Sequence, residues 1–180
     1  MRHFARHCAA WLLSVTLAAA ALAQSPHASA AVSAATLPAP TQPVILTING
    51  AITLRNGGDS ASFDAAMIGA LPAHEFRTWT PWFKEPATFR GPRLQSVLQA
   101  VGARGQTLRM VALNDYAVDV PVSDASRFEP ILATHINGKL LGVRDKGPLF
   151  LIYPFDARPE TRTDEFYGRS IWQVMRITVQ

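Results

Sequence analysis

The stretch Arg144-Asp145-Lys146-Gly147-Pro148-Leu149-Phe150-Leu151-Ile152-Tyr153-Pro154 places a charged Gly-Pro turn directly before five apolar residues and ends at a second proline. The run from Leu149 to Tyr153 is too short for a helix, and its side chains prefer strands. A continuous apolar run of this length is typical of a strand that is buried on both faces. We therefore expect a central strand on which the rest of the fold packs.

The turn before this strand carries Arg144 and Lys146 around Asp145. Gly147 permits backbone conformations that other residues resist. A rigid loop with two cations at the mouth of a buried strand suits an anionic ligand. The same residues are also typical of an ordinary solvated turn, so the sequence leaves both interpretations open.

The first residues have the pattern of a signal peptide. A basic segment precedes an apolar run from Ala9 to Ala21, which is short for a bilayer span, and Ala21-Leu22-Ala23 has the small-x-small pattern of a cleavage site. We expect cleavage after Ala23 and a periplasmic or secreted protein with no membrane span left. Cys8 is the single cysteine. Its removal would leave no thiolate nucleophile or metal ligand.

Residues 24–43 are mostly Ala, Ser, Thr and Pro, which bury too little surface to offset their ordering entropy. We expect a flexible linker there and one domain over residues 44–180. The 17 basic residues of the chain, less Arg2 and Arg6 of the signal, leave 15 against 13 acidic ones. This balance gives no reason to propose nucleic acid as a partner.

Strand and helix signals alternate through the domain. Ser62 or Asp64 suits the cap of a short helix through Ala70, and a second helix is predicted from Pro92, with Gly102 at its C-terminal cap. The predicted strands are 44–49, 51–54, 74–80, 107–113, 116–122, 131–136, 139–143, 149–153 and 171–179, with hairpin turns at Asn114-Asp115 and Asn137-Gly138. The class is therefore α+β, a mixed and mostly antiparallel sheet with short helices.

Several kinds of chemistry lack a sequence signal. His74 and His135, the two histidines of the domain, have no acidic or histidine neighbour at ligand spacing, so we interpret both as ordinary strand residues. The serines show no nucleophile-elbow pattern, and no glycine loop of the phosphate-binding kind is present. The sequence gives no support for a metal site, a hydrolytic triad or a nucleotide loop.

An aromatic stretch, Thr78-Trp79-Thr80-Pro81-Trp82-Phe83, holds more large rings than one strand face can bury. Trp79 and Trp82 suit the walls of a cleft for a flat ring, and Tyr116, beside Asn114, would add a hydrogen-bonding edge. The alternative is a core cluster beneath a loop. Arg90 and Arg93 flank Gly91-Pro92 before the second helix, where they would either hold an anion with the helix N-terminus or lie on the surface.

Short motifs follow one another from Val44 to Val179: Leu46-Thr-Ile-Asn-Gly50, Leu71-Pro72, Phe89-Arg-Gly-Pro-Arg-Leu94 with Val97-Leu98, Ala112-Leu-Asn-Asp-Tyr116, Ile136-Asn-Gly138, Asp145-Lys-Gly-Pro-Leu149 and Ile171-Trp172. This order resembles the molybdopterin-binding domain of the sulfite oxidase family. More closely, it resembles the small exported members called oxidoreductase molybdopterin-binding domain proteins. The resemblance implies a sulfite oxidase-type fold with a pterin cleft where these loops converge.

The chain departs from the family at its catalytic centre. Family enzymes bind molybdenum through a cysteine that falls near Thr78 to Trp82, where this chain has none, and a threonine hydroxyl is a poorer ligand for that metal. Phe150 stands where catalytic members carry an arginine, and Ile171 where they carry a lysine. Sulfite oxidation should therefore be absent, or the pterin dithiolene alone must hold the metal.

Two hypotheses follow from the residues and the resemblance. One is a molybdopterin-binding oxidoreductase subunit or cofactor carrier that meets a redox partner. The other, which the missing cysteine favours, is a non-catalytic module that binds a small anion or a partner segment and reports to a membrane-bound sensor. The predicted binding residues are Thr78, Trp79, Trp82, Arg93, Asn114, Asp115, Tyr116, Arg144 and Lys146.

Overall fold

The computed structural model describes residues 36–180. The predicted signal peptide and residues 24–35 of the predicted linker lie outside the described residues. Within the rest of that linker, the buried carboxylate of Asp64 accepts hydrogen bonds from the backbone N–H groups of Thr41 (2.8 Å) and Gln42 (3.1 Å). Contacts of the domain therefore begin before Val44. Composition does not reveal these contacts, because backbone N–H groups make them.

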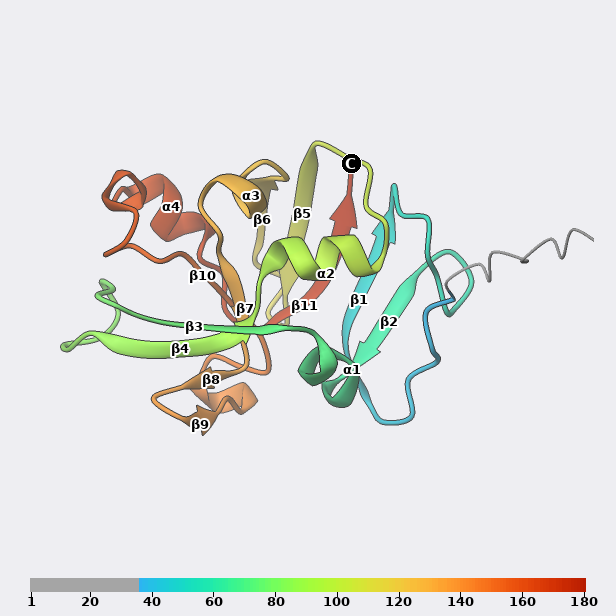
Figure 1. Cartoon of the computed structure of the whole chain (residues 1–180), viewed down its shortest axis with the longest axis horizontal. Coiled ribbons are helices and arrows are strands. Elements are labelled where there is room, and N and C mark those ends of the chain that lie inside the picture. The colour runs from blue at the N-terminus through green and yellow to red at the C-terminus, as the bar shows by residue number, and fades with distance from the viewer. Residues whose placement is uncertain (1–35) are drawn as a thin grey trace, which may run out of the picture. The chain divides into compact units, whose positions relative to one another are not determined.

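The largest sheet has five strands in the order β2-β1-β11-β5-β6 (Figure 1). Only β1 and β11 are parallel; the other neighbours are antiparallel. Their bounds are β1 Val44–Gly50, β2 Ala61–Asp64, β5 Thr107–Ala112, β6 Ala117–Pro121 and β11 Val174–Val179. The hairpin predicted around Asn114-Asp115 is confirmed as β5–β6. The strand predicted over 51–54 is absent; β2 takes the place beside β1.

Two smaller sheets complete the strand pairing. One has the order β3-β4-β8-β9 and the other pairs β7 with β10, all antiparallel. The bounds are β3 Ala73–Thr78, β4 Ala87–Pro92, β7 Ile131–Ala133, β8 His135–Ile136, β9 Lys139–Leu140 and β10 Phe150–Ile152. Asn137 and Gly138 have φ of 49° and 77°, which confirms the predicted two-residue hairpin turn between β8 and β9.

The helices are short. They are α1 Ala65–Ala70, α2 Leu94–Ala100, α3 Asp124–Arg127 and α4 Asp164–Arg169, with 3₁₀ turns at Val143–Asp145 and Pro159–Thr161. Asp64, rather than Ser62, caps α1 by accepting from the Met67 N–H at 2.9 Å. Pro92 ends β4 instead of opening α2, and Gly102 follows the helix at φ 58° as predicted. None of the helices described in residues 36–180 is long and apolar enough to cross a bilayer.

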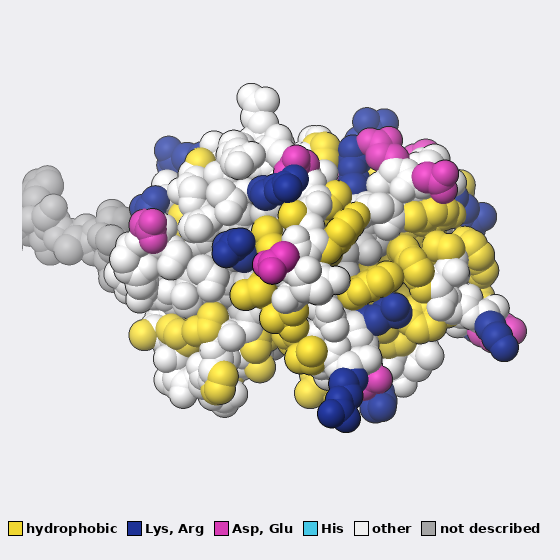
Figure 2. Space-filling view, turned by 180° about the vertical axis from the view of Figure 1, so that it is seen from behind, with side chains coloured by type: hydrophobic (Ala, Val, Ile, Leu, Met, Phe, Trp, Pro, Cys, Tyr) yellow, Lys and Arg dark blue, Asp and Glu magenta, His cyan; other side chains and the backbone are white. Residues whose placement is uncertain are grey.

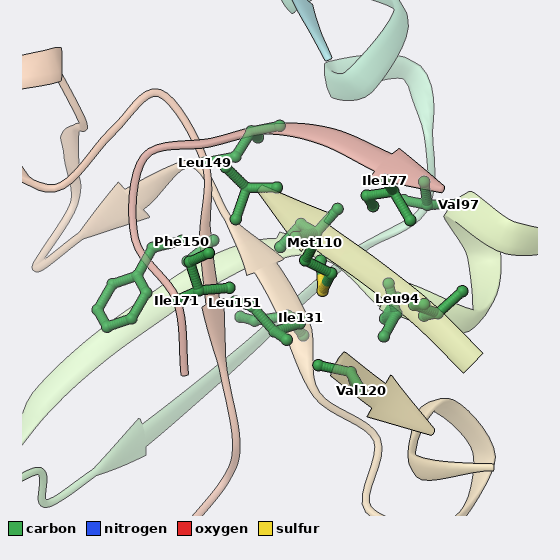
Figure 3. Close-up of a cluster of buried hydrophobic side chains, with 14 of the residues drawn as sticks. Leu94, Val97, Met110, Val120, Ile131, Leu149, Phe150, Leu151, Ile171 and Ile177 are labelled. Atoms are coloured by element: carbon green, nitrogen blue, oxygen red, sulfur yellow. The ribbon is translucent and has the colours of Figure 1, made fainter. Parts of the chain in front are cut away.

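The core lies between α2, the large sheet and the β7–β10 pair. Leu94 and Val97 of α2 point toward Met110 and Ile177 of the sheet, as Figure 3 shows. All residues from Leu149 to Tyr153 are fully buried, as predicted. β10 pairs with β7, and an isolated bridge from Phe150 to Trp172 joins it to the segment before β11, so this strand is central to the core but is not a strand of the large sheet. The observed class is α+β with mostly antiparallel strands.

Candidate functional site

A cleft of about 310 Å³ lies where the loop after β3, the β5–β6 turn, α4 and the segment before β11 meet. Its size is at the lower end of the range for small-molecule sites, and aromatic side chains dominate it. The lining residues are Trp82, Ala112, Asn114, Tyr116, Tyr167, Gly168, Ser170, Ile171 and Trp172. The sequence predicted three of these, namely Trp82, Asn114 and Tyr116, as binding residues.

Aromatic packing fixes the wall that Trp82 provides. Its ring stands nearly perpendicular to the rings of Trp172 and Tyr167, with centroids 5.9 and 6.1 Å away. It also meets Phe150 of β10 edge-on at 5.8 Å. Edge-to-face contacts of this kind orient rings and add to their burial energy. The cleft therefore has a preformed aromatic wall that is anchored to the buried strand.

Polar groups close the cleft on the side of the β5–β6 turn. The hydroxyl of Tyr116, a residue 50% exposed, donates to the Gly168 carbonyl of α4 at 3.3 Å. Asn114 Oδ1 accepts from the backbone N–H of Tyr116 at 3.2 Å, so the amide NH₂ of Asn114 is the group that remains for a ligand. Asp115 occupies the left-handed position of the turn, at φ 63°, and does not line the cleft.

Lys146 connects the cleft to a second hollow. Its Nζ lies 3.7 Å from the ring centroid of Trp172, a cleft residue, and 6.0 Å from that of Phe83. Burial lowers the pKa of the Lys146 ammonium. The second hollow has a volume of about 370 Å³ and is lined by Phe83, Ile136, Lys139, Leu140, Leu141, Arg144, Asp145 and Lys146. The predicted cations Arg144 and Lys146 thus lie together beside the aromatic cleft.

The backbone of this turn differs from the prediction. The left-handed residue is Lys146, with φ 73°, and not Gly147. Gly147 is needed for space instead, because a Cβ there would lie 2.5 Å from the Leu141 carbonyl oxygen. On the side of α4 and the tip of the β3–β4 hairpin, Figure 2 shows hydrophobic side chains gathered around a basic one. That pattern matches an apolar site with a cation at its border.

Six of the nine predicted binding residues do not line the cleft: Asp115, Arg144 and Lys146, described above, and Thr78, Trp79 and Arg93. Thr78 is buried, and its hydroxyl accepts from the Asp156 N–H at 2.9 Å, so it ties two loops together. Trp79 is 40% exposed and meets Tyr167 edge-on at 6.5 Å from outside the lining. Arg93 pairs with Glu129 at 3.5 Å. Strand β3 ends at Thr78, and of this aromatic stretch the loop that follows brings only Trp82 to the cleft.

The histidines lie away from the cleft. His74 neighbours Arg93, at 3.3 Å from Nη2 to Nδ1, and its pKa is lowered, by burial first and then by the Arg93 charge. His135 Nδ1 lies 2.8 Å from the Thr134 hydroxyl. Within residues 36–180, no three histidine, cysteine or acidic side chains gather in a way that could hold a metal ion.

Sequence reasoning missed the contribution of α4, which brings Tyr167 and Gly168 to the cleft. A buried network positions this helix: Asp124 accepts from the Arg169 guanidinium at 3.0 Å and from the Tyr153 hydroxyl at 2.8 Å. Charged residues are frequent in the segment 156–169. The adjacent aromatics Phe166-Tyr167 within it were the signal that it packs against the core.

Comparison of the sequence with protein-family models gives no match, and comparison with curated proteins gives none either. The functional argument therefore depends on the geometry of the site.

Proposed function

We propose that this chain is an exported, non-catalytic binding module that holds a small anionic ligand with a flat body. The flat body lies in the aromatic cleft, and the charge faces Lys146. The observation that carries the proposal is the contact of the Lys146 ammonium with the Trp172 ring, because it joins an apolar cleft to a cation. A cation that is partly desolvated attracts an anion more strongly than one in bulk water.

The charge around the cleft supports an anion. None of the residues that line the cleft is charged. The adjoining hollow carries Lys139, Arg144 and Lys146 against a single carboxylate, that of Asp145, which lies 3.9 Å from Lys139. This leaves a positive excess at the border of an aromatic site, and the amide of Asn114 adds a donor inside it. An anion or an acidic partner segment would offset that charge.

The second candidate is a molybdopterin-binding oxidoreductase subunit or cofactor carrier with a sulfite oxidase-type fold. The pairing of an aromatic cleft with a cationic hollow supports it, since a pterin ring and a phosphate would each find a suitable surface. We infer that Trp82 and Tyr116 would contact the ring and Lys146 the phosphate. Arg93 takes no part in this arrangement, because it pairs with Glu129.

The residues present do not fit a protein-bound molybdenum. The chain has no cysteine between residues 36 and 180. The hydroxyl of Thr78 is buried and accepts from a backbone N–H, so it is not free to bind a metal. Phe150 and Ile171, which the resemblance aligns with two catalytic basic residues, are both buried in the core. The alternative is therefore a pterin carrier rather than a complete enzyme.

Quenching of tryptophan fluorescence by pterin-6-carboxylate, a flat ring with one negative charge, tests the proposal. Lys146→Gln should weaken binding about 10-fold, which corresponds to about 1.4 kcal/mol. Lys84→Gln is the matched control, because Lys84 is exposed and outside both hollows. The proposed site would be wrong if Lys146→Gln and Lys84→Gln bound pterin-6-carboxylate with equal affinity. It would also be wrong if neither pterin-6-carboxylate nor inorganic phosphate bound to the unmodified chain.

Native mass spectrometry with elemental analysis distinguishes the two candidates. The protein is purified from the compartment to which it is exported. A stoichiometric pterin mass would support the carrier. Protein without a pterin, and unable to take one up, would leave the module with another small anion as its ligand.

A further inference from the structure

Four exposed hydrophobic side chains from four separate segments line one groove. Val44 opens β1, Leu113 follows β5, Val143 opens a 3₁₀ turn and Met175 lies in β11; each is between 38% and 53% exposed. The groove has a volume of about 250 Å³, and its other lining residues are Ile45, Leu46, Thr47 and Pro148. Scattered exposed hydrophobics are ordinary, but a cluster of this kind marks an interaction site.

The sheet topology explains the convergence. β1 and β11 run parallel and β5 runs antiparallel to both, so the starts of β1 and β11 lie at the same end of the sheet as the β5–β6 turn (Figure 1). Gln173, just before β11, holds the turn that begins at Val143 at this end of the sheet, because its side-chain Nε2 donates to the Val143 carbonyl at 2.7 Å. The groove is thus a built feature of one end of the sheet.

Two exposed arginines follow residues that line the groove. Arg144 follows Val143 and Arg176 follows Met175; both are exposed. Neither forms an ion pair with any residue in the described part of the chain. No lining residue is acidic; the exposed carboxylates of the adjoining turns are Asp115 and Asp145, and Asp145 is paired with Lys139 at 3.9 Å. Two unpaired guanidinium groups beside an apolar groove suit a partner that brings carboxylates.

We propose that this groove is the docking site for a segment of a partner protein that presents an apolar side chain flanked by carboxylates. A second copy of the chain suits it less. Leu140 is the most exposed large hydrophobic of the described residues, at 66%, and it follows Lys139. Docking of Leu140 from a second copy would therefore bring another cation against Arg144 and Arg176.

One turn links this groove to the cleft. Leu113 lines the groove, while Asn114 and Tyr116 of the same turn line the cleft. A partner that moves Leu113 would therefore also move two residues of the ligand site. The docking proposal goes beyond the proposed function and does not depend on it, since the groove needs no ligand in the cleft to receive a partner.

A random 12-residue peptide library displayed on phage, selected against the immobilised full chain, tests the proposal. The selected peptides should carry Leu, Ile or Phe flanked by Asp or Glu. A synthetic copy of such a peptide should bind at least 10-fold more weakly to Met175→Asp and Val143→Asp, two changes on different segments. Leu140→Asp is the matched control, because Leu140 is exposed but lies outside this groove. The Leu140→Asp variant should bind the peptide as tightly as the unmodified chain does.

Circular dichroism and urea unfolding establish that the variants fold, and two positions are tested so that loss of one variant does not end the experiment. Each competing occupant gives its own contrary result. Self-association in sedimentation that Met175→Asp abolishes would assign the groove to a second copy. Binding to phosphatidylglycerol vesicles that Met175→Asp abolishes would assign it to a lipid surface. Absence of an apolar-acidic consensus, or equal peptide binding by Met175→Asp and Leu140→Asp, would also overturn the proposal.

Discussion

The hydroxyl of Tyr153 donates a 2.8 Å hydrogen bond to the carboxylate of Asp124, and both side chains are buried. Arg169 of α4 pairs with the same carboxylate at 3.0 Å. One buried anion thus holds the end of the central strand and the helix that lines the cleft. Removing either partner of such a pair leaves a buried charge without compensation.

Asp124→Ala should lower the free energy of unfolding by about 3–5 kcal/mol, because Arg169 and Tyr153 both lose their acceptor. Tyr153→Phe should cost about 1–2 kcal/mol, since the ion pair survives. Urea unfolding measures both. Asp119→Ala breaks the exposed pair with Arg109, at 3.1 Å, and should cost less than about 1 kcal/mol. Equal losses for Asp124→Ala and Asp119→Ala would contradict a structural role for the network.

The same tyrosine predicts loss of stability in alkali. Burial, together with the Asp124 charge, raises the pKa of the Tyr153 phenol far above its ordinary value of about 10. A raised pKa means that the folded state retains a proton that the unfolded state loses. Stability should therefore be unaffected by this group below about pH 10 and should fall at higher pH. Tyr153→Phe should show a smaller fall, measured as the urea midpoint at pH 8 and pH 11.

Close packing between β4 and β7 predicts a second stability effect. A Cβ at Gly91 would collide with the carbonyl oxygen of Leu132, whereas one at Gly69 in α1 would meet nothing within 4 Å. Gly91→Ala should destabilise by about 1–3 kcal/mol through overpacking. Gly69→Ala adds the same methyl group to a helix and should stabilise by about 0.5–1 kcal/mol. Thermal unfolding gives the melting temperature of both variants. A change of the same sign in the two melting temperatures would contradict the packing described.

Local signals predicted much of the fold, whereas contacts distant in the sequence were not predictable. Asn137-Gly138 specified its hairpin because both residues accept a positive φ, and the spacing of Leu94, Val97 and Leu98 specified α2. The pairing of β10 with β7 had no such signal. Nor did the contact between Asp124 and Arg169, 45 residues apart, which positions α4.

The candidate site divides in the same way. Trp82 and Tyr116 were predicted because aromatic residues beside a turn are visible in the sequence. Thr78 and Trp79 lie outside the cleft because β3 ends at Thr78, which the sequence does not show. Arg93 pairs with Glu129, which lies far along the chain, so the sequence did not show this contact. Side-chain type was therefore readable from the sequence, but the direction of each side chain was not.

The cap of α1 predicts sensitivity to acid. The N–H of Met67 is the main group that holds the pKa of Asp64 below its ordinary value of about 3.9, and the N–H groups of Thr41 and Gln42 add to it, against the opposing effect of burial. A lowered pKa gives stability that is present above about pH 4 and is lost as the pH falls through the folded-state pKa. Asp64→Asn should be less stable than the unmodified chain at pH 7, and it should lose less stability than that chain between pH 5 and pH 2. Asp119→Asn, an exposed control, should match the unmodified chain.

The cleft predicts different roles for two exposed aromatics. Tyr116 lines it and donates to the Gly168 carbonyl, whereas Trp79 lies outside. Tyr116→Ala should weaken the binding of pterin-6-carboxylate about 5–10-fold, since loss of one aromatic contact costs about 1–1.5 kcal/mol. Trp79→Ala should leave the affinity unchanged. Titration by calorimetry measures both affinities. A larger loss of affinity for Trp79→Ala than for Tyr116→Ala would place the ligand on the outer side of Tyr167.

Lys146 predicts how ligand binding depends on pH. Burial lowers the pKa of its ammonium below the ordinary value of about 10.4, so the charge that an anion needs disappears earlier than on an exposed lysine. The other charged groups of the hollow are Arg144 and the Lys139–Asp145 pair. Affinity for naphthalene-2-carboxylate, a flat anion whose charge is constant over this range, should therefore fall as the pH rises toward 10. Lys146→Arg, which keeps its charge, should bind equally at pH 7 and pH 10. If the unmodified chain showed the same flat profile as Lys146→Arg, the Lys146 ammonium would not be the group that holds the anion.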